Sequence, residues 1–175
     1  DGTLDGLVAA AKRYEAAGFD NLWMANIFGL DAINALGIVG RETSRIGLGT
    51  AVVPTYPRHP VAIAQQALTT QAASKGRFSL GIGLSHKIVI ENMFGFSYEK
   101  PARHMKEYLE VLAPLCRGEG AAFQGEQYKV AAQLQAEIEG GLRVPGQRLP
   151  AIRSLAAELG LHRDTIALAY EQLGQ

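Results

Sequence analysis

The sequence predicts an α/β fold: a partial (β/α)8 (TIM) barrel with parallel strands, followed by an all-α helix-turn-helix segment. Residues 46–53 and 78–84 are short apolar runs without a polar face, which is typical of parallel strands covered on both sides. The helical pattern between them completes a strand–helix–strand unit, whose strands are parallel. At about residue 131 strand patterns stop, and only helical patterns follow.

The first 42 residues predict a helix, a strand and a second helix. Thr3 is a suitable cap for the first helix, and Gly18 is a natural stop. The strand is expected over residues 19–24 and the second helix over 31–42. The apolar positions at helical spacing are Leu4, Leu7, Val8, Ala11 and Tyr14 in the first helix and Ile33, Leu36 and Val39 in the second.

The remaining elements up to residue 130 continue the alternation. Pro60 is expected to open a helix, because a missing N–H costs nothing in the first turn, and Gly76 to end it. Pro101 is expected to begin a long helix, and residues 122–130 to form a hairpin around Gly125. Alternating strands and helices are the pattern of β/α barrels. Three strands cannot close a barrel, so we predict a truncated barrel piece over residues 1–130 and a separate helical piece over 131–175.

Composition narrows the function classes. No apolar run approaches the ~18 residues of a membrane span, and no signal peptide pattern occurs at the N-terminus. The single Cys116 excludes an internal disulfide and fits a reducing cytoplasm, where we expect the protein to reside. Basic and acidic residues number 17 each, so contact with nucleic acid would depend on a few placed residues rather than on a bulk positive field.

Three stretches carry a family resemblance: GFDNLWMANIFGLDAI, RIGLGTAVVPTYPRHPVAIAQQALTTQAASKGRFSLGIGLSH and FGFSYEKPARHMKEYLEVLAPLCRGEG. In this order and spacing, residues 1–130 resemble the luciferase-like monooxygenase family, and most closely its deazaflavin-dependent oxidoreductases. The resemblance implies a deazaflavin or FMN cofactor at the C-terminal ends of the strands. It also implies a non-proline cis peptide between about Thr50 and Val53. The cofactor-binding residues that it implies are Asn26, Thr50, Val52, Gly81, Gly83 and Ser85.

The histidines and the cysteine have competing interpretations. His86 follows the third strand and is the candidate catalytic residue, as a proton donor, because the pKa of an unperturbed histidine lies near neutrality. The alternative for His86 is a solvent-facing loop residue. His59 is expected to hold the loop at a helix start, His104 to be solvated, and Cys116 to be a buried, unreactive thiol.

Residues 131–175 predict short helices separated by Gly and Pro, with a helix-turn-helix around Gly160. The stretch GQRLPAIRSLAAELGLHRDTIALAYEQL resembles the GntR-type winged helix-turn-helix regulators, although the chain stops before the wing of that family. The resemblance implies binding to double-stranded DNA. The residues implied to contact DNA are Arg153, His162, Arg163 and Thr165.

Three functions therefore remain open. The chain is a luciferase-like oxidoreductase piece, truncated and inactive, fused to a DNA-binding head; or a GntR-type regulator that binds DNA; or a folded chimera without activity of its own. Because the predicted sheet has unpaired edges, we also expect a homo-oligomer.

Overall fold

The computed structural model of the protein describes residues 2–131. These residues belong to two compact units, one spanning Asp1–Pro101 and the other beginning at Ala102. The predicted helix-turn-helix over 131–175, with its candidate DNA-contacting residues, lies outside the described residues. None of the helices within residues 2–131 is long and apolar enough to cross a membrane.

Three helices of the first unit begin where the sequence predicts. Helix α1, Leu4–Ala16, is capped by the Thr3 hydroxyl, which accepts from the Gly6 N–H at 3.1 Å. Helix α2, Ala32–Glu42, is capped by Asp31, and helix α3, Pro60–Ala73, begins at the expected proline. Helix α3 ends before Gly76, because Ser74 caps it and Lys75 already adopts a left-handed conformation with φ of 55°.

The strands are parallel and lie in sequential order, as predicted. Strand β1, Asn21–Met24, pairs with β2, Gly47–Thr50, which pairs with β4, Phe78–Ser79. The predicted strands 46–53 and 78–84 are each interrupted, however. Their second halves, β3 (Val53–Pro54) and β5 (Ile82–Gly83), form a separate parallel pair. The interruption in the first of them is a cis peptide between Ala51 and Val52, within the range that the family resemblance implied.

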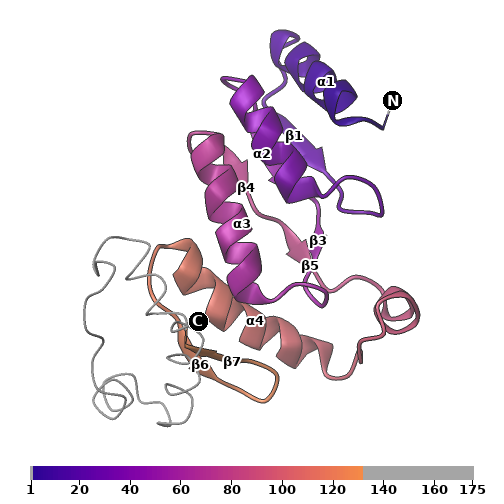
Figure 1. Ribbon diagram of the computed structural model, residues 1–175, viewed down its shortest axis with the longest axis vertical. Coiled ribbons are helices and arrows are strands. Elements are labelled where there is room, and N and C mark those ends of the chain that lie inside the picture. The colour runs from indigo at the N-terminus through magenta and orange to yellow at the C-terminus, as the bar shows by residue number, and fades with distance from the viewer. Residues whose placement is uncertain (1, 132–175) are drawn as a thin grey trace, which may run out of the picture. The chain divides into compact units, whose positions relative to one another are not determined.

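The core of this unit lies between the sheet and helices α2 and α3, which lie side by side (Figure 1). The inward positions predicted for α2 are confirmed as fully buried. The buried apolar side chains are Ile33, Leu36 and Val39 from α2, Ile63, Ala64 and Ala67 from α3, and Ile46, Leu48 and Phe78 from the strand regions.

The second unit contains helix α4, Pro101–Cys116, and a hairpin of β6, Ala122–Gln124, and β7, Lys129–Ala131. The predicted hairpin around Gly125 is thus confirmed. Glu107 joins helix to hairpin, because its carboxylate accepts from three successive backbone N–H groups, those of residues 126–128, at 2.8 to 3.3 Å. Burial would raise the pKa of Glu107, but these donors outweigh it and lower the pKa.

Two predictions for α4 are wrong. His104 is buried rather than solvated, because its ring packs near Tyr108 and Tyr128 and its Nδ1 lies 3.1 Å from Oε1 of Gln127. Cys116 is exposed rather than buried, because it falls one position outside the stripe that buries Leu115. Partial desolvation raises the pKa of the Cys116 thiol, and its reactivity stays a prediction.

Candidate functional site

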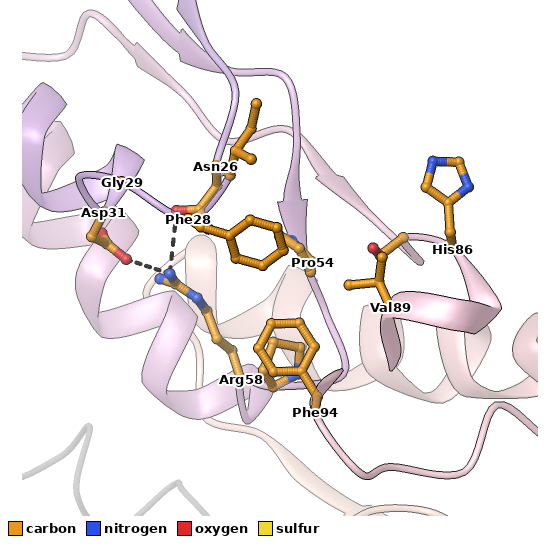
Figure 2. A pocket seen from close by; sticks show the side chains of 12 residues that line it. Asn26, Phe28, Gly29, Asp31, Pro54, Arg58, His86, Val89 and Phe94 are labelled. Carbon is orange, nitrogen blue, oxygen red and sulfur yellow. Dashed lines mark hydrogen bonds and ion pairs between the residues drawn. The ribbon is translucent and has the colours of Figure 1, made fainter. Parts of the chain in front are cut away.

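An open pocket of about 630 Å³ lies at the carboxyl ends of β1, β3 and β5 (Figure 2). Its walls are the segments that follow these three strands. Because the strands are parallel, these segments meet at one edge, which is where β/α proteins bind ligands. The volume falls within the ~300–1,000 Å³ of small-molecule sites. The lining residues are Asn26, Ile27, Phe28, Gly29, Asp31, Pro54, Pro57, Arg58, Ser85, His86, Val89 and Phe94.

Arg58 ties two of these segments together. Its guanidinium pairs with the Asp31 carboxylate and donates to Asn26 Oδ1 at 3.3 Å, as the dashed lines in Figure 2 show. It also donates to Oε1 of Gln66 in α3 at 3.1 Å. The side chains of Arg58 and Asp31 are only 18% and 28% exposed, so the pair is weakly screened by solvent. These contacts of Arg58 with Asp31, Asn26 and Gln66, called the Arg58 clamp below, fix the segment after β1 against the segment after β3.

The same side chains cap the helices that begin at this edge. Asn26 Oδ1 accepts from the Ala32 N–H at 3.0 Å, and Asp31 Oδ1 accepts from the Asn34 N–H at 2.9 Å. At the start of α3, His59 Nδ1 accepts from the Val61 N–H at 3.3 Å, which confirms its predicted role. Burial lowers the pKa of His59, which favours the neutral ring that this hydrogen bond needs.

Close packing joins Thr50 and Val52 to Gly81 and Gly83, which precede the segments that line the pocket. Thr50 is buried, and its hydroxyl donates to the Gly81 carbonyl at 2.8 Å and accepts from the Gly81 N–H at 2.9 Å. A side chain at Gly81 would meet the Thr50 carbonyl oxygen at 2.0 Å, and one at Gly83 would meet Val52 at 2.7 Å. These two glycines are therefore required by contact with the segment that carries the cis peptide.

Ser85 and His86 follow β5. Ser85 adopts a left-handed conformation, with φ of 62°, and its carbonyl accepts from the Tyr98 hydroxyl at 3.2 Å. The Tyr98 ring in turn stacks on Tyr56, with centroids 5.2 Å apart. His86 is exposed, and within residues 2–131 its ring has no hydrogen-bond partner. In Figure 2 its imidazole projects from the end of this segment, apart from the Arg58 cluster.

The outer wall of the pocket is apolar and exposed. Ile27 and Phe28 come from the segment after β1 and are 69% and 66% exposed. Phe94 follows the π-helix Val89–Met93 and is 39% exposed. Figure 2 shows the rings of Phe28 and Phe94 projecting from different segments toward the same space. Exposed apolar side chains gathered at a pocket mouth are typical of a ligand-binding surface.

The sequence-predicted site residues divide into two groups. Asn26, Ser85 and His86 line the pocket, whereas Thr50, Val52, Gly81 and Gly83 are not among its lining residues and instead contact one another. The sequence reasoning missed the Arg58–Asp31 pair and the apolar wall. The position of Arg58, in the turn between a predicted strand and the helix at Pro60, was the available signal for the pair.

The residues present suit a planar, largely apolar ring. Aromatic and aliphatic side chains line much of the pocket, and Asn26 and Ser85 supply polar groups at the strand ends. The pocket offers less to the phosphate-bearing tail of such a cofactor, because Arg58, the arginine in the lining, is paired with Asp31. The described residues therefore fit the ring portion of a flavin-type cofactor and leave its phosphate unassigned.

Comparison with known proteins agrees with the family resemblance. The chain is 41% identical over 106 residues to a Mycobacterium tuberculosis protein provisionally named a coenzyme F420-dependent oxidoreductase, covering 61% of this chain and 30% of that one. It is 31% identical over 151 residues to the 5,10-methylenetetrahydromethanopterin reductase of Archaeoglobus fulgidus, covering 85% and 45%. The chain thus spans less than half the length of these relatives.

Solved structures show the same fold. The coenzyme F420-dependent tetrahydromethanopterin reductase of Methanopyrus kandleri superposes with a TM-score of 0.66 at 23% identity, covering 75% of this chain and 42% of that one. A Baeyer–Villiger monooxygenase of Pseudomonas putida in complex with FMN also gives 0.66, at 16% identity, covering 74% and 38%. The luciferase-like monooxygenase family model matches residues 1–168, and so runs across the boundary predicted at 131. The chain belongs to the luciferase-like monooxygenase family.

Proposed function

We propose that this chain carries the ring-binding part of an F420- or FMN-dependent oxidoreductase. The carrying observation is the pocket at the carboxyl ends of β1, β3 and β5, built over the segment with the Ala51–Val52 cis peptide. The names of its relatives support the cofactor class, since they include F420-dependent enzymes and an FMN complex. When bound, such a cofactor supplies two-electron hydride chemistry.

Each part of the pocket has a task in this proposal. The Thr50–Gly81 hydrogen bonds hold together the two chain segments that precede the pocket walls, and Arg58 fixes the wall that contains Asn26. His86 stands at the mouth, where an imidazole can exchange a proton with a substrate oxygen near neutral pH.

Filling the pocket tests the proposal. Gly29 lines the pocket, and a Cβ built on it meets nothing within 4 Å, so Gly29→Trp adds an indole to the pocket lining at a position with room for a side chain. Gly2→Trp is the matched control, since Gly2 also faces open space and lies outside the pocket lining. Calorimetric titration with FMN and with F420 should show binding to the wild-type chain and to Gly2→Trp, and at least tenfold weaker binding to Gly29→Trp.

Two results would overturn the ring-binding role. One is the absence of heat with either cofactor at millimolar concentration. The other is equal affinity of the Gly29→Trp and Gly2→Trp variants. A His86→Gln variant that binds cofactor normally but loses turnover would separate binding from proton exchange.

A DNA-binding role for residues 131–175 is a second proposal, supported by the helix-turn-helix pattern alone. Arg163, at the start of the predicted recognition helix, offers a fork suited to guanine or phosphate. The balanced charge favours weak binding, at the ~10⁻⁴ to 10⁻⁶ M of non-specific contacts. An anisotropy titration with duplex DNA at low salt tests it. If Arg153→Ala and Arg163→Ala leave the curve unchanged, the proposal fails.

A further inference from the structure

The charges in the pocket restrict what it accepts. Its lining contains one fixed cation, Arg58, and one fixed anion, Asp31, and the two form an ion pair. Arg58 also donates to Asn26 and Gln66. An incoming phosphate or carboxylate would have to break this cluster to gain a cation, and breaking a largely buried pair is costly.

The helix ends near the pocket are also occupied. A helix N-terminus attracts anions through its unpaired N–H groups. Here the N–H groups of Ala32 and Asn34 in α2 already donate to Asn26 and Asp31. In α3 the first residue is Pro60, which has no N–H, and the next N–H donates to His59. The two helices that begin beside the pocket therefore offer an anion little at their first positions.

The apolar wall favours a different kind of ligand. Ile27, Phe28 and Phe94 line the pocket and are 69%, 66% and 39% exposed. Removing such surface from water is worth roughly 25 cal/mol per Å². Two phenyl rings from separate segments can also contact an aromatic or alicyclic body from two directions.

We propose that the pocket selects an apolar, uncharged substrate, an aromatic or alicyclic alcohol or ketone, through Ile27, Phe28 and Phe94, and that the Arg58–Asp31 pair excludes phosphorylated substrates. The inference rests on the proposed oxidoreductase function, because it names the substrate class of the same pocket. Arg58 acts here as a positioning residue, which fixes the wall without contacting the substrate.

The test uses 2-naphthol and 2-naphthyl phosphate, which share a ring system and differ in the phosphate. Binding of each to the full chain is measured by ligand-observed NMR titration. We expect 2-naphthol to bind at least tenfold more tightly than its phosphate. Phe28→Ala and Phe94→Ala should each weaken 2-naphthol about tenfold, as expected for truncating a phenylalanine that the ligand buries. Phe19→Ala is the matched control, since Phe19 is 57% exposed and precedes β1.

Asp31→Asn tests the charge argument directly. Asparagine caps a helix as well as aspartate does, so α2 keeps its cap while Arg58 loses its counter-charge. This variant should bind 2-naphthyl phosphate at least threefold more tightly than the wild type, and so narrow the preference for 2-naphthol over its phosphate. Tighter wild-type binding of the phosphate would overturn the inference. So would 2-naphthol curves that Phe28→Ala and Phe94→Ala do not alter.

Titrations with and without FMN or F420 separate this inference from the proposed function. If 2-naphthol follows the expected pattern but neither cofactor binds, the oxidoreductase proposal fails and the selectivity of the pocket stands. If a cofactor binds but the 2-naphthol pattern is absent, the substrate class fails alone.

Discussion

Replacing Thr50 by valine should destabilise the protein, because it removes the hydrogen bonds between Thr50 and Gly81. Valine has nearly the same shape, so the change removes only the hydroxyl that bonds both to the Gly81 N–H and to its carbonyl. The carbonyl keeps a second donor, the Val53 N–H at 2.9 Å, whereas the Gly81 N–H loses its acceptor. One lost hydrogen bond costs ~1 kcal/mol, and an unsatisfied donor adds ~1–3 kcal/mol. We expect a loss of about 2–4 kcal/mol in the free energy of unfolding.

Thr50→Ser is the control, because it keeps the hydroxyl and loses one methyl group, worth about 1 kcal/mol. Urea unfolding can be followed by the fluorescence of Trp23, the chain's single tryptophan, which lies against Gly49 in the adjacent strand. Equal unfolding midpoints for the valine and serine variants would refute the role of the hydroxyl. A valine variant as stable as the wild type would refute it as well.

Three further predictions concern stability and association. Glu107→Gln should lower the urea midpoint at pH 7, and the difference from the wild type should disappear in acid. A carboxylate whose pKa is lowered on folding stabilises the folded state above its unfolded pKa, and this stabilisation is lost as the pH falls through its folded pKa. A difference in midpoint that does not depend on pH would contradict this. Lys75→Gly should raise the free energy of unfolding by up to about 1 kcal/mol, and the thermal midpoint with it, because Lys75 has a φ of 55°, which glycine adopts more readily. A lower thermal midpoint would count against this prediction. Light scattering should detect a homo-oligomer, because within residues 2–131 β1 and β4 each lack a strand neighbour on one side, and a stable monomer would argue against this.

Local rules predicted most element boundaries. Thr3, Asp31, Pro60 and Gly125 mark helix starts and a turn through their own backbone or side-chain chemistry, and all four occupy the expected positions. The parallel order also followed from the alternation of strands and helices. These features depend on residues close together in the chain, which is why the sequence suffices for them.

Apart from Cys116, whose position on its own helix was misjudged, the misses involve contacts between distant residues. His104 is buried by Gln127 and Tyr128, which lie on the hairpin and not on its own helix. The interruption of residues 78–84 follows from hydrogen bonds between Gly81 and Thr50, 31 positions apart. The Arg58 clamp joins two loops that only the fold brings together. Residue type and spacing could predict His86 and Ser85 as candidates, but not the charge balance of their pocket.

The interruption of the sheet into two tiers has a consequence for how this scaffold can be altered. Strands β1, β2 and β4 share one register, while β3 and β5 pair separately beyond the interruption. A change in the β3–β5 pair need not shift the pairing of β1, β2 and β4. Mutant libraries confined to the exposed residues 86–88 should thus keep a high proportion of folded members, whereas libraries over 46–50, or at the buried Val53 and the closely packed Gly83, should not. Directed evolution could therefore change residues at the pocket while the β1–β2–β4 sheet keeps its structure.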